Sequence, residues 1–491
     1  MVRRRNTALW EATIDQGTHF RPPAPLPRAR RAGPVALVRA LWNSPIEAWT
    51  QAHFEEPVVT HRLPFGKAII VNDPGGIEHV LLGNAANYRK DTLQRRIIAG
   101  SLSNGLLTAE SEQWRIQRRT LAPLFSRRTI QGFAAPMAQV ADEFVVRWRA
   151  GADGGAVDMA AEMTRLTLEV LERTIFSDGL GHGIEEFRAA MRDYFDTIGR
   201  IDPFDVLGLP DAIPRLTRFW ARGALRFFDT AIDTIIANRR KRLAEAPGEV
   251  GRDILTLLLE AQDPESGRGL SEVEVKSNII TFIAAGHETT ANALAWSLYL
   301  LSQSPEWSER VATEAAREMA APLDGAADRM VETRAVIEEA MRLYPPLAAI
   351  SREAIGADEV AGQPIAAGCT VVIAPYLLHR HRRVWERPDL FDPTRFLPGA
   401  REQIGRYAFL PFGAGPRICI GAAFALQEAT LVLGTIVRSF RLALAPSATV
   451  WPLQRLTLRP RGGLPMVLTW RTGGSHVRTA HDNAVAFLDA E

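Results

Sequence analysis

The chain has 491 residues, of which 46% are hydrophobic and 23% charged, so it is long enough for a large folded core. Its formal net charge of +2 gives no reason to expect nucleic acid as a partner. Two cysteines, Cys369 and Cys419, do not make a disulfide framework, and no apolar run is long enough for a signal peptide or membrane span. These features favour a cytoplasmic protein.

The predicted elements change in kind along the chain. Residues 1–33 are rich in Arg and Pro and are predicted as an extended arm, followed by the main domain at 34–472 and a polar tail at 473–491. Short strands are predicted at Val58–Thr60, Ala68–Val71, Thr370–Ile373, Leu456–Leu458 and Met466–Thr469. Helical periodicity is predicted over about residues 111–344, for example at Ile184–Ile198, Thr217–Ala244, Asp253–Gln262, Ser271–Leu301 and Val331–Leu343, and one more helix at about Ile420–Ser439. The sequence therefore predicts one mainly helical α+β domain with small sheets near both ends.

A glycine-rich loop, residues 412–421 (FGAGPRICIG), precedes the last predicted helix. A helix N-terminus favours the thiolate form of a cysteine such as Cys419, and glycines allow a tight, close-approaching loop. Arg417 offers a fork of N–H donors to a carboxylate. Taken alone, a lone cysteine in such a turn is more often a small buried hydrophobe. Cys369, on a predicted strand, keeps that interpretation.

The predicted helix Ser271–Leu301 is apolar until the run GHETT at Gly286–Thr290 interrupts it. A glycine and an acid inside a buried helix cost stability, and such a local conflict often marks a functional site. A groove or bulge at Ala285-Gly286 would give a small ligand room against the backbone. The residues alone also allow a helix with a polar stripe that faces solvent.

Together these segments resemble the cytochrome P450 family. The loop matches the haem-binding signature F-x-x-G-x-R-x-C-x-G, and residues 285–290 match the motif A/G-G-x-D/E-T-T. The resemblance spans roughly residues 35–470 and is closest to soluble bacterial members similar to fatty-acid hydroxylases, although this chain stops before any flavin domain. It implies a P450-like fold, with haem b between a long central helix and a C-terminal helix that follows the cysteine loop.

The resemblance also implies a role for each matching residue. Cys419 is the expected axial ligand of the haem iron, and Glu288 with Thr289 is the expected acid–alcohol pair that delivers protons. The expected haem contacts are Phe412, Gly415, Arg417, Gly421, Trp114, Arg118 and Arg352. A structural triad is expected from Glu339, Arg342 and Arg395, with His379 also structural. The expected substrate-facing positions, all of which could equally be ordinary core residues, are Leu107, Ala285, Leu347, Ala349, Ile350 and Leu456.

The implied activity is that of a monooxygenase that inserts one oxygen atom from O₂ into a lipophilic molecule such as a fatty acid, terpenoid or steroid. Electrons are expected from NAD(P)H through a separate ferredoxin or flavodoxin and its reductase. Such an acidic partner suits a basic face to which these residues contribute: Arg115, Arg118, Arg119, Arg401 and Arg406. The apolar connection Pro203 to Trp220 resembles the lid over the substrate entrance. We expect a monomer without a transmembrane segment.

Two other functions remain open at this point. Some family members use peroxide directly or rearrange hydroperoxides, and a haem sensor or carrier would have no turnover. The intact Glu288-Thr289 pair argues against both, because neither function needs delivered protons.

Overall fold

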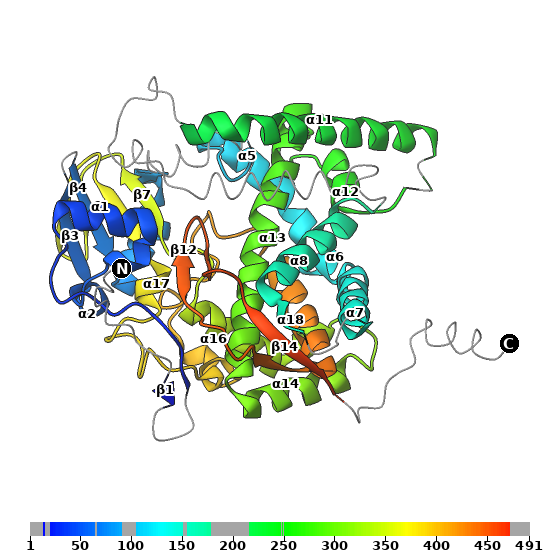
Figure 1. Ribbon diagram of the computed structural model, residues 1–491. Coiled ribbons are helices and arrows are strands. Elements are labelled where there is room, and N and C mark those ends of the chain that lie inside the picture. Colours follow the sequence, from blue (N-terminus) through cyan, green and yellow to red (C-terminus); the bar gives the residue numbers. More distant parts are fainter. Residues whose placement is uncertain are drawn as a thin grey trace.

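A computed structural model describes residues 13–14, 20–63, 66–90, 105–150, 155–177, 216–246, 248 and 250–471 of the chain. The predicted helix at 184–198, most of the expected lid at 203–220 and the tail at 473–491 lie outside these residues. Helices dominate the described part, and the sheets are small (Figure 1). The predicted mainly helical α+β fold is confirmed.

The central element is helix α13 (Glu272–Ser302), which begins with a capping box formed by Ser271 and Glu274. Most of its residues are apolar, and beyond the first turn most of its side chains are buried. A helix that is apolar on all sides must lie inside the fold. It packs against α8 (Met159–Ile175), α16 (Val331–Leu343) and α18 (Ala422–Ser439), while α11 (Leu216–Glu245) crosses one end.

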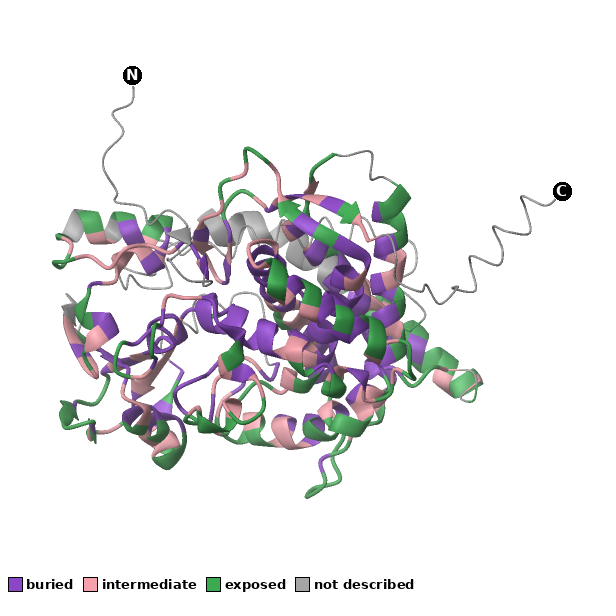
Figure 2. Ribbon diagram, turned by 90° about the horizontal axis from the view of Figure 1, so that it is seen from below, coloured by how far each residue is buried: buried purple, intermediate pink, exposed green. Residues whose placement is uncertain are grey.

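The remaining helices surround this core, and Figure 2 shows buried residues concentrated in the interior with exposed ones on the outer elements. The longer ones are α1 (Pro34–Asn43), α5 (Ser111–Leu121), α7 (Ala134–Ala150), α12 (Ile254–Glu260) and α14 (Pro305–Glu318). The short ones are α2 (Ala52–Glu55), α3 (Pro74–Glu78), α6 (Arg127–Gln131), α15 (Ala326–Arg329) and α17 (Pro375–Leu378). Of the predicted helices that are described, each matches an observed one to within two residues, because strong periodicity and caps define them.

The sheets differ more from the expectation. Three strands predicted near opposite ends of the chain join two that were not predicted in one five-stranded sheet. Its order is β3 (Val58–Leu63), β4 (Gly66–Val71), β10 (Thr370–Ile373), β7 (Ile350–Ala354), β5 (Tyr88–Arg89). A three-stranded sheet joins β11 (Phe440–Leu444), β14 (Pro465–Trp470) and β6 (Val157–Asp158). The two-stranded pairs are β1 (Thr13–Ile14) with β2 (Phe20–Arg21), β8 (Asp358–Val360) with β9 (Gln363–Ile365), and β12 (Pro452–Gln454) with β13 (Leu458–Pro460). The strand predicted at Leu456–Leu458 is wrong, because Leu456 and Thr457 form the turn between β12 and β13.

Part of the predicted N-terminal arm packs on the main domain. Phe20 is buried and lies edge-on to Tyr299 of α13, with ring centroids 5.9 Å apart. The hydroxyl of Tyr344 donates to the carbonyl of Pro23 at 2.8 Å. The boundary predicted at residue 33 therefore marks a change in amino-acid composition. It does not mark the edge of the core, because residues 20–23 already contribute to it.

A buried acid in α18 stands apart from the apolar core around it. Glu428 has no solvent exposure, and neither carboxyl oxygen has a hydrogen-bond partner within the described structure. Burial therefore raises its pKa well above the usual 4.5, so that the folded protein holds it as the neutral acid.

This acid predicts an unusual pH dependence of stability. A group with a raised folded-state pKa stabilises fully below its unfolded pKa and loses that contribution as pH rises toward the folded value. As pH rises from about 5 toward the folded-state pKa, the unfolding free energy of the wild type should fall by up to about 1.4 kcal/mol per pH unit relative to Glu428→Gln. Urea unfolding of both proteins measures this difference. Glu386→Gln, whose carboxylate is exposed, is the control and should follow the wild type.

Candidate active site

The cysteine loop is held in a tight turn. The N–H of Cys419 donates to the carbonyl of Phe412 at 2.9 Å, which closes the loop just before α18 begins. Gly415 has a φ of +72°, and a Cβ there would lie 1.8 Å from the carbonyl oxygen of Leu81. Gly413 also has a positive φ, but open space surrounds it. Only glycine therefore fits at 415, for both conformation and contact.

The thiol of Cys419 lies deep in the molecule and yet is accessible. Cys419 is exposed to solvent, but the protein atoms around it remove enough water to raise the pKa of its thiol. The N–H of Gly421 and the guanidinium of Arg118 oppose that rise. A side chain with both properties faces a space inside the protein. By contrast, Cys369 is buried and its thiol lies 3.3 Å from the carbonyl of Lys67.

The long helix passes close to this loop. A Cβ on Gly421 would lie 4.0 Å from both the sulfur of Cys419 and the ring of Phe125. That ring packs edge-on against Phe282 of α13, with centroids 5.1 Å apart. The cysteine loop, Phe125 and α13 are therefore neighbours.

One stretch of α13 is accessible although the turns on either side are mainly buried. Ala285 is exposed, and Glu288 and Thr289 are partly exposed. Because both flanks of this stretch are covered, it faces an interior space like Cys419. The bulge that the sequence suggested is not formed, since α13 is an uninterrupted helix. Gly286 instead allows close packing, because a Cβ there would lie 3.2 Å from Leu171 of α8.

The acid and the alcohol of this stretch have defined partners. Glu288 accepts a hydrogen bond from the hydroxyl of Thr457 at 2.8 Å, and Arg459 lies 3.9 Å from the same oxygen. The hydroxyl of Thr289 donates to the carbonyl of Ala285, one turn earlier, at 2.7 Å. The sequence did not identify Thr457 as a partner of Glu288, because no local pattern around residue 457 indicates a contact with α13.

Cations gather at one edge of the same region. Arg417 lies over the ring of Trp114 at 4.5 Å and pairs with Glu110 at 2.5 Å. Burial, together with the nearby charges of Arg417 and Arg352, lowers the pKa of Lys90 to about 7. Crowded, partly desolvated cations favour an anionic group beside them.

Arg118 lies on the same face of α5 as Trp114, four residues on, and burial lowers its pKa. Neither Lys90 nor Glu110 was predicted. The only sequence signal for Lys90 is that lysine is rare in this Arg-rich chain.

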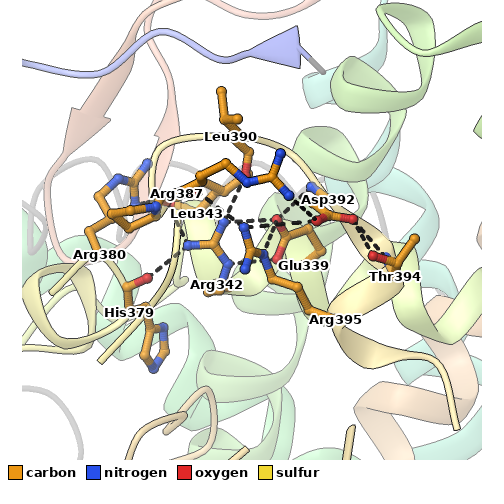
Figure 3. A network of polar contacts seen from close by, with 11 residues as sticks. Glu339, Arg342, Leu343, His379, Arg380, Arg387, Leu390, Asp392, Thr394 and Arg395 are labelled. Atoms are coloured by element: carbon orange, nitrogen blue, oxygen red, sulfur yellow. Dashed lines mark hydrogen bonds and ion pairs between the residues drawn. The ribbon is translucent and has the colours of Figure 1, made fainter. Parts of the chain in front are cut away.

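The expected triad is assembled inside the protein (Figure 3). Arg342 donates to both oxygens of Glu339, at 2.6 and 2.8 Å, and neither side chain has any solvent exposure. Arg395 lies farther away, with Nε 3.9 Å from Glu339. The backbone N–H of Asp392 donates to the same carboxylate at 2.8 Å.

A histidine connects this network to the cysteine loop. Arg342 donates to the carbonyl of His379 at 2.8 Å, and Nε2 of His379 accepts from the N–H of Leu410 at 2.8 Å. Burial and the charge of Arg342 lower the pKa of His379 to about 3, so the ring is neutral and Nε2 can accept. Leu410 precedes Phe412 by two residues, so the network reaches the start of the loop.

The expected substrate-facing residues share one property. None of them is buried, although all are apolar and most lie next to buried residues. Leu347 is 43% exposed, and its neighbour Ala348 only 3%. The carbonyl of Leu107 contacts the ammonium of Lys90 at the cation-rich edge. The partly or fully exposed positions are Leu107, Ala285, Leu347, Ala349, Ile350 and Leu456.

These residues fit a haem. Cys419 offers a sulfur to a metal from inside the protein, and the cations near Arg417 offer partners for two carboxylates. The described residues contain no group of three or more His, Cys, Asp or Glu side chains placed to hold a metal ion. An iron whose other ligands come from a macrocycle needs no such group.

Comparison with known proteins decides the family. The profile of the cytochrome P450 family matches residues 23–465. The chain belongs to the cytochrome P450 family. It is 32% identical to the cyclooctat-9-en-7-ol 5-monooxygenase of Streptomyces melanosporofaciens, over 87% of this chain and 91% of that protein. It is 32% identical to the pentalenene oxygenase of Streptomyces avermitilis, over 77% and 82% of the two chains.

The fold agrees with this assignment. The haem domain of cytochrome P450DA superposes with a TM-score of 0.79 at 25% identity, covering 91% of this chain and 98% of that one. The chain is therefore a P450 monooxygenase, which uses a haem iron, O₂ and electrons from redox partners. No helix among the described residues is long and apolar enough to cross a membrane.

The loop geometry makes Gly415 the most sensitive position in the signature. Gly415→Ala should prevent haem incorporation, because the methyl group would overlap the backbone at Leu81. Gly413→Ala is the matched control, with a similar φ but open space, and should cost only about 1–2 kcal/mol. Haem content per chain after purification measures both. Equal haem content in the two variants would contradict this account of the loop.

Proposed function

We propose that this P450 carries haem b and oxidises terpenoid-like lipophilic molecules, with electrons from NAD(P)H through a separate ferredoxin or flavodoxin and its reductase. The observation that carries the proposal is the placement of Cys419 and the Glu288–Thr289 pair, both accessible from inside the protein. Two relatives support the substrate class, since their names give cyclooctat-9-en-7-ol and pentalenene. We further propose a cytoplasmic monomer whose catalytic domain is residues 34–472, with residues 20–23 of the N-terminal arm packed against it.

In this proposal each part of the site has a distinct task. Cys419 holds the iron, and the cations Arg417, Arg352, Arg118 and Lys90 neutralise the two propionates. Bound haem supplies O₂ activation, which an anionic thiolate ligand favours. The Glu339–Arg342–Arg395 network braces the loop from behind. It is structural, and removing one partner would leave a buried charge at a cost of roughly 3–5 kcal/mol.

The polar residues of α13 handle protons. Oxidation of one C–H bond consumes O₂, two electrons and two protons, and yields the alcohol and one water. Glu288 releases a proton toward the site and regains one from solvent. Thr289 is the next residue of α13, and its hydroxyl passes the proton on. The apolar positions around Leu347 and Leu456 hold a substrate with few polar groups.

The peroxide-dependent and sensor alternatives have less support. A protein that only binds a gas, or that receives oxygen already reduced as peroxide, does not need an acid held next to a helix alcohol. The presence of Glu288 and Thr289 at adjacent positions of the accessible stretch of α13 therefore favours reductive O₂ chemistry.

The first test is spectroscopic. The reduced carbon monoxide complex should show the Soret band position typical of thiolate-ligated haem, and Cys419→Ser should move it, because the thiolate is lost. Cys369→Ser is the control and should keep the band position. Cyclooctat-9-en-7-ol, pentalenene and dodecanoic acid are then tested for spin-state shift and for product with NADPH and surrogate partners. A wild-type band at the position of imidazole-ligated haem would refute the thiolate assignment.

Two of the arginines expected on the docking face for the electron donor form ion pairs within the chain. Arg119 pairs with Asp263 at 2.6 Å and with Glu265, and Arg401 pairs with Glu338 at 3.2 Å. Their charges are largely neutralised within the chain. Arg115 is 65% exposed, with an exposed partner in Glu112. We therefore propose that Arg115, with the exposed Arg406, carries most of the attraction to an acidic partner.

Charge reversal tests this face. Arg115→Glu should slow reduction by the ferredoxin severalfold at low salt, and the difference should shrink at high salt, because exposed charges are screened. Stopped-flow reduction under carbon monoxide measures the rate. Arg240→Glu, an exposed Arg on α11, is the control and should leave the rate unchanged. Equal rates for Arg115→Glu and wild type at low salt would remove Arg115 from the docking face.

A further inference from the structure

The hairpin formed by β12 and β13 runs along one face of α13. The indole N–H of Trp296 donates to the carbonyl of Leu458 at 3.0 Å. The amide of Asn292 donates to the hydroxyl of Thr457 at 3.0 Å, and that hydroxyl donates to Glu288 at 2.8 Å. The three α13 residues are spaced four apart, so they lie on one face of the helix. The hairpin is thus fastened to the face of α13 that carries the acid.

The direction of these hydrogen bonds is fixed by chemistry. Thr457 and Asn292 are only 3% and 6% exposed, so water does not compete freely with them. The NH₂ group of Asn292 can only donate to the hydroxyl, whose single proton then points to Glu288. Two lone pairs on the hydroxyl oxygen leave one for the proton of a neutral Glu288. Thr457 can therefore hold this acid in both of its protonation states.

The same turn also reaches the substrate-facing region. Leu456 precedes Thr457 directly and is partly exposed. The N–H of Leu458 donates to the carbonyl of Pro346 at 3.0 Å, and Pro346 precedes the exposed Leu347. The guanidinium of Arg459, 3.9 Å from Glu288, further draws the carboxylate toward the hairpin. The expected substrate-facing residue Leu456 and the residue that contacts the acid thus occupy adjacent positions in one short turn.

We propose that Thr457 is a positioning residue for proton delivery: it sets where the Glu288 carboxyl group lies, and its turn links that position to substrate contact at Leu456. This inference rests on the proposed function, in which Glu288 supplies protons. The balance of the reaction is unchanged, since Glu288 gives a proton to the site and takes one from solvent in each transfer. Thr457 gains and loses no proton overall.

The test replaces the hydroxyl without changing the shape. Thr457→Val in the haem-loaded protein should keep the carbon monoxide spectrum and the substrate-induced spin shift, since the apolar contacts remain. Product formed per NADPH should fall by roughly three- to tenfold, with a matching rise in hydrogen peroxide. The substrate is whichever of cyclooctat-9-en-7-ol, pentalenene and dodecanoic acid the wild type oxidises fastest. Thr457→Ser, which restores the hydroxyl, should recover most of the yield.

Two controls separate positioning from a structural role. Thr174→Val removes an equally buried hydroxyl, whose bonds go to carbonyls of its own helix α8, and should leave the yield unchanged. Iodosylbenzene supplies a single oxygen atom and needs no delivered protons, so Thr457→Val should oxidise substrate with it at the wild-type rate. In the Glu288→Gln background, Thr457→Val should have little further effect, because both changes act on one step.

Three results would overturn the inference: unchanged yield per NADPH in Thr457→Val, an equal loss with iodosylbenzene, or full additivity with Glu288→Gln. Failure of the proposed function is distinguishable from these. If the wild type oxidises none of the three compounds, the substrate class is wrong. The split of NADPH electrons between hydrogen peroxide and water still reports proton delivery, and Thr457→Val should then shift it toward peroxide.

Discussion

The ion pair between Glu339 and Arg342 has no contact with water, and the path of the chain around it follows from that. Two charges in a low-dielectric interior are tolerated only when their remaining hydrogen-bonding groups are also satisfied. Arg342 therefore donates to the backbone carbonyls of His379, Pro388 and Leu390 as well as to its acid. These bonds fasten the irregular stretch after β10 to α16, and through His379 they reach the start of the cysteine loop.

With the loop fixed from behind, its opposite side is free to face ligand. The positive φ of Gly415 brings the turn against the backbone at Leu81, and Cys419 is left accessible from the interior. Phe125 connects this side of the loop to Phe282, and so to the stretch of α13 that holds Ala285, Glu288 and Thr289. The family relationship explains why these elements recur together, and the contacts explain how this chain holds them.

The acids in and around this core lie in three different environments. The Glu339–Arg342 pair has hydrogen-bond partners on both sides, as is expected at the centre of a structural network. Glu428 has no partner and is therefore kept neutral by burial. Glu288 differs from both, since it is partly exposed and held by a hydroxyl and a guanidinium from another part of the chain. In the proposed function this acid changes its protonation state, and an intermediate environment of this kind permits that.

The sequence by itself determined the helices α11, α13, α16 and α18, the fold class and the family, because periodicity, caps and the spacing around Cys419 and Glu288 are local signals. It also identified the Glu339–Arg342 pair, whose members lie on one helix face. Only the tertiary structure decided which strands share a sheet, since β4 and β10 pair across about three hundred residues. It alone placed Thr457 beside Glu288 and Lys90 beside Arg417, because contacts between distant segments depend on how whole elements pack and leave no mark in local sequence.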